Sequence, residues 1–212
     1  MITGLPHGVE GSTRDRLLAA GARLFPERGF RETTVGDIEA AAGLQPRRGA
    51  LYHYFPTKQA LLEAAVQTHL AVIEHGRREM EGLPGADVRT EALLIGRWFL
   101  AELDAERHLV RILEHDGDRL PDIRALVRER VVDAGHRTVE QILRRRIRLD
   151  GTRVDTNALA VMLIAPLANV RRVTWTFGAP PLGIDDDVLL NTWADAISLL
   201  AKQYGGGSKS RR

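Results

Sequence analysis

The sequence predicts an all-α fold with about nine helices. Three observations support this prediction: apolar residues recur with helical period along most of the chain, Ser, Thr and Asp residues precede these stretches as capping signals, and Gly or Pro residues end them. No stretch alternates with the period of a β-strand. With 212 residues, of which 44% are apolar, the chain is long enough to bury a sizeable core.

The first three predicted helices are short and follow one another closely. The first two open with capping boxes, in which a Ser or Thr is followed three positions later by an Asp, and both end at a Gly. The third ends before Pro56, because the residue preceding a proline is pushed out of the helical conformation. Their predicted ranges are 12–29, 34–43 and 46–54.

The later helices are mostly longer. Thr57 is placed to cap the first of them, and Pro121 suits a first helical position. The acidic triplet at 185–187 is interpreted as the start of the last helix rather than as a metal site, since carboxylates favour helix N-termini. The predicted ranges are 57–82, 87–104, 109–113, 121–147, 155–177 and 185–204.

The composition excludes several classes of protein. The chain has no Cys, which rules out disulfide frameworks, Cys-zinc sites and thiol catalysis. Its longest apolar run, residues 158–168, falls short of the roughly 18–20 residues that a membrane span needs. The first twelve residues lack the basic start and apolar stretch of a signal peptide. We therefore expect a soluble cytoplasmic protein with no membrane partner.

Recognisable catalytic and metal-binding motifs are missing from the sequence. There is no nucleophile elbow, phosphate loop or dinucleotide fingerprint. The histidine pairs 69/75 and 108/115 lack the i,i+4 spacing of a helical zinc pair. We expect no catalytic residue, no metal ion and no cofactor.

The charge distribution is more informative than the net charge of +2. Between Leu44 and Lys58 there are two arginines and one lysine but no acid, so this stretch could hold a polyanion. An ordinary solvated surface is the alternative interpretation. The dense cluster of arginines at 144–148 is interpreted as a helix C-terminus, which favours cations.

The strongest functional signal is the string TTVGDIEAAAGLQPRRGALYHYFPTKQALL, which runs from Thr33 to Leu62. Short helices joined by a tight glycine-containing link are the arrangement of a helix-turn-helix. The Thr-Thr-Val start, the Ala-Ala-Gly ending at Gly43, the run from Gly49 to Phe55 and the downstream Lys58 all contribute. On these motifs, about fifty residues resemble the DNA-binding domain of the TetR family of bacterial repressors.

The string departs from that family at one place. The family usually has four steps between the glycine that ends the second helix and the glycine before Ala-Leu-Tyr, whereas Gly43 and Gly49 are six apart here. Either the turn is longer or the recognition helix starts earlier. The carry-over of roles is therefore secure only from Gly49 onward.

The residue types suit contact with DNA. Arg47 and Arg48 are expected at the N-terminal end of the recognition helix, where arginine can bind guanine O6 and N7. Small residues allow the backbone to approach DNA, and hydroxyl, imidazole and ammonium groups can bind phosphate. Thr33 and Thr34 are expected to offer hydroxyls and helix N-terminal amides to a flanking phosphate. The predicted DNA-binding residues are Thr33, Thr34, Arg47, Arg48, Gly49, Ala50, Tyr52, His53 and Lys58.

Three other residues of this run are assigned to packing. Leu51 and Phe55 lie four positions apart and are expected in the core. Tyr54 is interpreted as a packing residue.

The resemblance implies that the last two helices pair with their twins in a homodimer and that the preceding helices enclose an effector pocket. The expected interface is 155–177 with 185–204, including Leu189 and Ile197. The effector is expected to be an apolar to amphipathic small molecule of unknown identity. Its expected contacts, each of which could instead be a core residue, are Trp98, Phe99, Met162 and His69.

The sequence thus predicts a ligand-responsive transcriptional repressor that binds a palindromic, double-stranded DNA operator. Two alternatives stay open: an activator of the same architecture, and an all-α enzyme that uses the bundle cavity. The expected organisation is a disordered arm at 1–11, a helix-turn-helix domain at 12–58, a ligand-binding and dimerisation domain at 59–204, and a disordered tail at 205–212.

Overall fold

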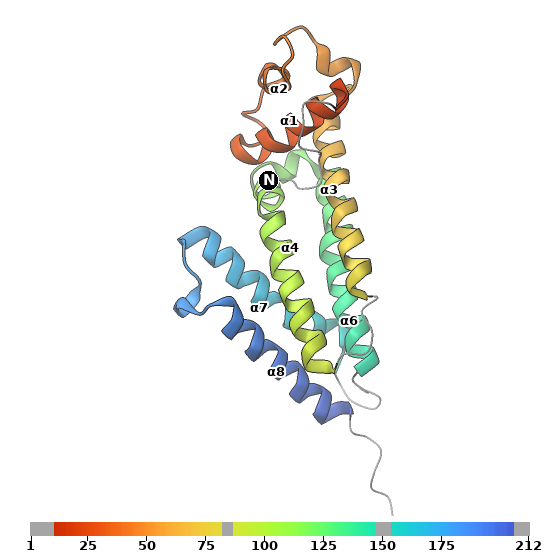
Figure 1. Ribbon diagram of the computed structural model, residues 1–212, viewed down its shortest axis with the longest axis vertical. Helices are drawn as coiled ribbons and strands as arrows, with labels where there is room; N and C mark the ends of the chain where they lie inside the picture. The colour runs from red at the N-terminus through yellow and green to blue at the C-terminus, as the bar shows by residue number, and fades with distance from the viewer. Residues whose placement is uncertain (1–10, 82–86, 147–153, 206–212) are drawn as a thin grey trace, which may run out of the picture. The chain divides into compact units, whose positions relative to one another are not determined.

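The computed structural model describes residues 11–81, 87–146 and 154–205. Throughout these ranges the secondary structure is helical (Figure 1). The α-helices are α1 (Thr13–Arg28), α2 (Val35–Ala41), α3 (Lys58–Glu81), α4 (Val88–Asp116), α5 (Pro121–Val127), α6 (Ala134–Arg146), α7 (Thr156–Phe177) and α8 (Asp186–Gly205). The remaining helical segments are η1 (Ala50–His53), η2 (Gly117–Arg119), η3 (Arg128–Asp133) and η4 (Pro181–Gly183).

The helices begin where the capping signals predict. Ser12 and Asp15 form a reciprocal capping box at α1, and Thr34 and Asp37 form another at α2. The Thr57 hydroxyl accepts from the Ala60 amide at 2.9 Å, and Asp155 and Asp185 cap α7 and α8 in the same way. The predicted all-α fold is confirmed.

Two predicted boundaries are wrong. The ranges 87–104 and 109–113 belong to one continuous helix, α4, because charged residues at 104–108 interrupt the apolar pattern without supplying a Gly or Pro that would break the helix. The range 46–54 contains only the 3₁₀ turn η1. Since α5, the π-helical η3 and α6 follow without a break, the described residues form seven separate α-helices rather than about nine.

Several predictions concern residues that lie outside the described ranges. They are the N-terminal arm before residue 11, the helix ends at Gly82, Pro84 and Gly151, and the tail after Gly205.

The chain divides into two compact units. The first contains residues up to Arg77 together with Ala105–Val131, and the second contains Arg78–Asp104 together with the residues from Val132 onward. The first unit therefore includes the predicted 12–58 segment, most of α3 and the C-terminal part of α4.

The core of the first unit is built from α1, α2, η1, α3, α4 and α5. Side chains of α3 that the helical period places inward are fully buried, among them Leu61, Leu70 and His69. α1 approaches α3 closely at Gly21, where an added Cβ would lie 2.8 Å from Leu61 Cδ2. A larger residue at Gly21 would therefore push α1 away from α3.

The second unit has its own core, formed by α4, α6, α7 and α8. α7 and α8 are tied together by the indole of Trp193, which donates to the Leu163 carbonyl at 2.8 Å. Arg171, which is buried on α7, binds Asp186 at the start of α8 through two bonds of 2.7 and 2.6 Å. Asp186 therefore serves an ion pair, while Asp185 supplies the cap.

One helix of the described residues, α7, is long and apolar enough to cross a membrane by length and composition alone. A third of its most apolar stretch is buried within the structure. The apolar run 158–168 considered in the sequence is shorter than this helix, because Asn157 precedes it and Asn169 and two arginines follow it.

Candidate nucleic-acid interface

The turn between α2 and η1 carries the cationic stretch. Three of its residues have left-handed backbone conformations: Gly43 (φ 70°), Arg47 (φ 61°) and Gly49 (φ 74°). This conformation is unfavourable for a non-glycine residue and cannot propagate a right-handed helix. The predicted helix over 46–54 is therefore wrong, and Arg47 and Arg48 lie in a turn rather than at a helix start.

A buried carboxylate holds this turn. Glu39 of α2 is fully buried, and its two oxygens accept hydrogen bonds from the Arg47 amide at 2.7 Å and the Leu51 amide at 3.1 Å. The sequence interpretation missed this residue. A signal was present, because Glu39 is four positions after Val35 and three before Ala42, on the inward face of α2.

The side chains beyond this anchor divide between core and surface. Leu51 and Phe55 are buried as predicted, and the Arg14 guanidinium lies 5.1 Å from the centre of the Phe55 ring. Tyr54, interpreted as a packing residue, is 45% exposed, so that interpretation is wrong.

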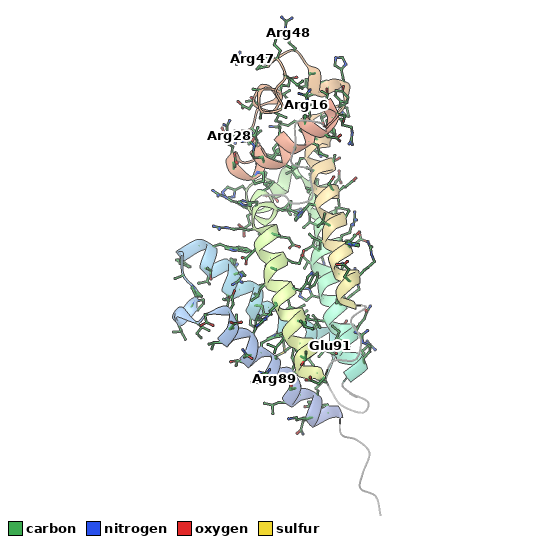
Figure 2. The ribbon with its side chains drawn as sticks, viewed as in Figure 1. Arg16, Arg28, Arg47, Arg48, Arg89 and Glu91 are labelled. Carbon is green, nitrogen blue, oxygen red and sulfur yellow. The ribbon has the colours of Figure 1, made fainter. Side chains whose placement is uncertain are left out.

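The residues predicted to face DNA are accessible in this region. Arg47, Arg48, Tyr52 and His53 are exposed, and Gly49 and Ala50 are half-buried. Figure 2 shows Arg47 and Arg48 at the extremity of the first unit, with Arg48 projecting beyond the turn.

The two threonines before α2 differ. Thr33 is fully buried, and its hydroxyl donates to the Gly29 carbonyl at 2.8 Å, so its predicted phosphate contact is wrong. Thr34 is exposed and its hydroxyl donates to Asp37 Oδ2 at 2.6 Å. Hydrogen bonds from Thr34 are the main reason that the pKa of Asp37 is lowered from its usual value.

Lys58 also has a different role from the predicted one. Its ammonium donates to the Phe30 carbonyl at 2.7 Å and the Thr33 carbonyl at 2.8 Å, and it lies 4.4 Å from the centre of the Phe30 ring. Burial lowers the pKa of this ammonium. The group thus fastens the α1–α2 link to α3 instead of projecting toward a phosphate.

Replacing Lys58 with Met is expected to lower the free energy of unfolding by about 2 kcal/mol, because hydrogen bonds to a charged group are lost and two carbonyls lose their donor. Urea unfolding measures the change, with Lys202→Met on the exposed surface of α8 as the control. Unchanged stability together with weaker binding to every DNA sequence would instead restore the phosphate contact predicted from the sequence.

The segment that carries this turn is similar to known proteins. The family model described as "Bacterial regulatory proteins, tetR family" matches residues 17–65, which include most of α1, then α2, the turn, η1 and the start of α3. The N-terminal segment 17–65 of the chain thus matches the tetR family.

Two relatives are similar to longer parts of the chain. The HTH-type transcriptional regulator UidR of Escherichia coli (strain K12) is 28% identical over 137 residues, which span 64% of this chain and 65% of the relative's length. The HTH-type transcriptional repressor KstR2 of Rhodococcus jostii (strain RHA1) is 33% identical over 103 residues, 49% of each chain. This chain thus matches slightly less than two thirds of UidR's length and about half of KstR2's.

The fold is shared more widely than the sequence. The structure of Salmonella enterica GusR matches with a TM-score of 0.63 at 23% identity, covering 90% of this chain and 95% of that chain. The fold is therefore shared with GusR over the C-terminal helices as well as over the matched N-terminal segment.

The residues predicted to contact an effector are divided between the two units. Met162 is 70% exposed on α7, which contradicts a place in a monomer cavity, and His69 is buried in the first unit. Trp98 and Phe99 are half-buried in the second unit, where the Trp98 indole nitrogen is buried without a hydrogen-bond partner.

The second unit contains an apolar cavity of about 20 Å³ that none of these four residues lines. α4, α6 and α8 supply its walls, which are formed by Val88, Ala92, Ile95, Val139, Ile142, Leu143, Trp193 and Ile197. In the described parts of the chain, no group of three or more acidic or His residues is placed to hold a metal ion.

Proposed function

We propose that this tetR-family protein is a sequence-specific DNA-binding transcriptional regulator that acts as a cytoplasmic repressor. The observation that carries the proposal is the exposed Arg47–Arg48 pair on a turn whose backbone is fixed by buried Glu39. A fixed backbone presents the two guanidinium groups in a reproducible direction, which base recognition needs. The word repressor in the name of KstR2 supports the direction of regulation.

Each exposed group has a role in this proposal. The arginine pair supplies the guanidinium that reads a guanine edge in the major groove, where arginine binds O6 and N7 together. Tyr52 and His53 bind phosphates, and Gly49 and Ala50 let the backbone approach. Contacts with several phosphates make binding strongly dependent on salt.

The test is a gel shift and a fluorescence titration with DNA from immediately upstream of the protein's own gene. Arg47→Ala/Arg48→Ala is expected to reduce the preference for the operator over a mismatched site by about 1–3 kcal/mol, the discrimination of a bidentate arginine–guanine contact. Arg119→Ala in η2, which also removes an exposed arginine from the first unit, is the matched control.

An unchanged preference in the double variant would move base reading to Gln45 or to residues after Gly49. If the wild-type protein prefers no sequence, the proposed function fails. A reporter gene behind the same DNA distinguishes a repressor from an activator.

We also propose that the protein works as a homodimer through α7 and α8. Their solvent-facing sides expose apolar residues that the second unit leaves uncovered, including Val161, Met162, Val188 and Leu199. Of the two residues expected at the interface, Ile197 is instead buried in the core of the second unit, so that expectation is wrong for Ile197, whereas Leu189 is half-buried and keeps its proposed place. In a dimer the two copies of the turn that carries Arg47 and Arg48 lie at a fixed spacing, which binding to a palindromic operator requires.

The proposed effector is a small apolar molecule that binds in the second unit. The cavity there has an apolar lining, but its volume of about 20 Å³ is close to that of one water molecule, so an effector would have to enlarge it. Thermal stabilisation by candidate compounds, compared between wild type and Ile142→Trp, tests this placement, because the larger side chain fills the cavity. A compound that stabilises both proteins equally binds elsewhere.

A further inference from the structure

The turn from Gly43 to Gly49 is long, and something in the structure must fix its backbone. Six positions separate Gly43 from Gly49, against the four usual in the family that the string resembles. The turn ends at η1, where the Leu51 amide is buried and needs an acceptor. A free loop of this length would also leave the direction of Arg48 undefined.

We infer that Glu39 is a positioning residue for base recognition, and that it makes Arg48 rather than Arg47 the residue that determines sequence specificity. The inference rests on the proposed DNA-binding function and deepens it. Because Glu39 is fully buried, its side chain cannot touch DNA. It acts through the backbone of the turn.

The carboxylate of Glu39 binds both ends of the segment from Arg47 to Leu51. One oxygen accepts from the Arg47 amide at 2.7 Å and the other from the Leu51 amide at 3.1 Å. The two bonds span the residues that carry Arg48 and Gly49. Because charge-assisted bonds are stronger than neutral ones, they can hold Arg47 in its left-handed conformation.

The two arginines leave this segment in different directions. The aliphatic part of Arg47 lies along Gly36 of α2, where an added Cβ would be 3.4 Å from Arg47 Cγ. The Arg47 charge also contributes to the lowered pKa of Asp37, after the Thr34 hydrogen bonds and the charge of Arg28. Arg47 is therefore held against α2, whereas Arg48 extends past the turn (Figure 2).

The first experiment separates the arginines. Arg48→Ala is expected to reduce the ratio of affinities for matched and mismatched operators by about tenfold, the lower range for one bidentate arginine–guanine contact. Arg47→Ala is expected to weaken both affinities by a similar factor and leave the ratio nearly unchanged. Equal effects of the two variants on the ratio would overturn the assignment to Arg48.

The second experiment tests Glu39. Glu39→Gln keeps the volume of the side chain but replaces one acceptor oxygen with a donor, so it cannot serve both amides. It is expected to lower the affinity ratio by about tenfold, as Arg48→Ala does. Hydrogen exchange at the Leu51 and Arg47 amides should accelerate in the same variant, and circular dichroism checks that the fold persists.

A shortened turn supplies the decisive control. Deleting Gln45 and Pro46 restores four steps between the two glycines while keeping both arginines. In the Glu39→Ala background this deletion is expected to recover the affinity ratio lost through Glu39→Ala alone, because the shorter turn no longer needs the carboxylate.

Two results would overturn the inference about Glu39. One is a Glu39→Gln protein with faster exchange at both amides but an unchanged affinity ratio. The other is a Glu39→Ala protein whose lost ratio the deletion does not recover. A wild-type protein with no sequence preference is a different result, which removes the proposed function rather than the role of Glu39 in the turn.

Discussion

Leu199→Asp is expected to convert the protein from a dimer into a monomer at micromolar concentration and to reduce operator affinity by at least about 100-fold. Leu199 is 66% exposed on α8, on the same face of the helix as exposed Val188. A carboxylate buried in an apolar interface stays unpaired and costs several kcal/mol. Loss of the second half-site contact then removes the gain in affinity that two linked sites provide.

Light scattering after gel filtration measures the mass, and the gel shift measures operator binding. Met162→Asp on the neighbouring helix should give the same result, since Met162 lies with exposed Ala158 and Ala165 on one face of α7. Gln67→Asp on the exposed surface of α3 is the control. A monomeric wild-type protein, or dimeric variants, would contradict the assigned interface.

The second large effect is expected at Arg171, where replacement with Met should lower the free energy of unfolding by about 3 kcal/mol. Its guanidinium binds Asp186 on α8 through two bonds and Asp104 on α4 at 3.1 Å, so one side chain joins three helices. The value lies at the lower end for a broken buried pair, because both aspartates are half-exposed and stay hydrated.

Urea unfolding measures this loss, and Arg171→Lys is the informative comparison. A lysine keeps the charge but cannot supply the planar pair of donors, so it should recover less than half of the lost stability. Full recovery by lysine would show that charge alone matters at this position.

The same ion pair predicts a dependence on pH. Hydrogen bonds from Arg171 lower the pKa of Asp186 below its usual value of 3.8. A carboxyl whose pKa is lowered in the folded state contributes stability that is present above its unfolded pKa and is lost as the pH falls through the folded pKa. The stability difference between wild type and Asp186→Asn should therefore be constant at neutral pH and shrink below about pH 4; a difference that persists unchanged at pH 2 would contradict it.

The parts of the fold that the sequence predicted are those governed by neighbours in the chain. The capping boxes at Ser12 and Thr34, and the buried face of α3, depend on residues three or four positions apart, so periodicity reveals them. The break assigned within α4 failed for a related reason: charged residues at 104–108 weaken the apolar pattern but do not interrupt backbone hydrogen bonding.

The roles of residues in the candidate site were harder to predict, because they depend on contacts between elements that are distant in the sequence. Thr33 and Lys58 have side chains that can bind phosphate, but both are taken up by carbonyls of the α1–α2 link. The conformation of Arg47 depends on a carboxylate eight residues earlier. No local pattern specifies that such groups will meet.

The fastening of Lys58 to the Phe30 and Thr33 carbonyls has a mechanical consequence. These bonds join the segment between α1 and α2 to the first turn of α3. We therefore expect α2 and the turn that carries Arg47 and Arg48 to move together with α3. α3 has 24 residues and is therefore about 36 Å long, at 1.5 Å per residue. From this length, a rotation of α3 by about 5° about its C-terminal end would displace its N-terminal end by roughly 3 Å, close to the rise of one base pair.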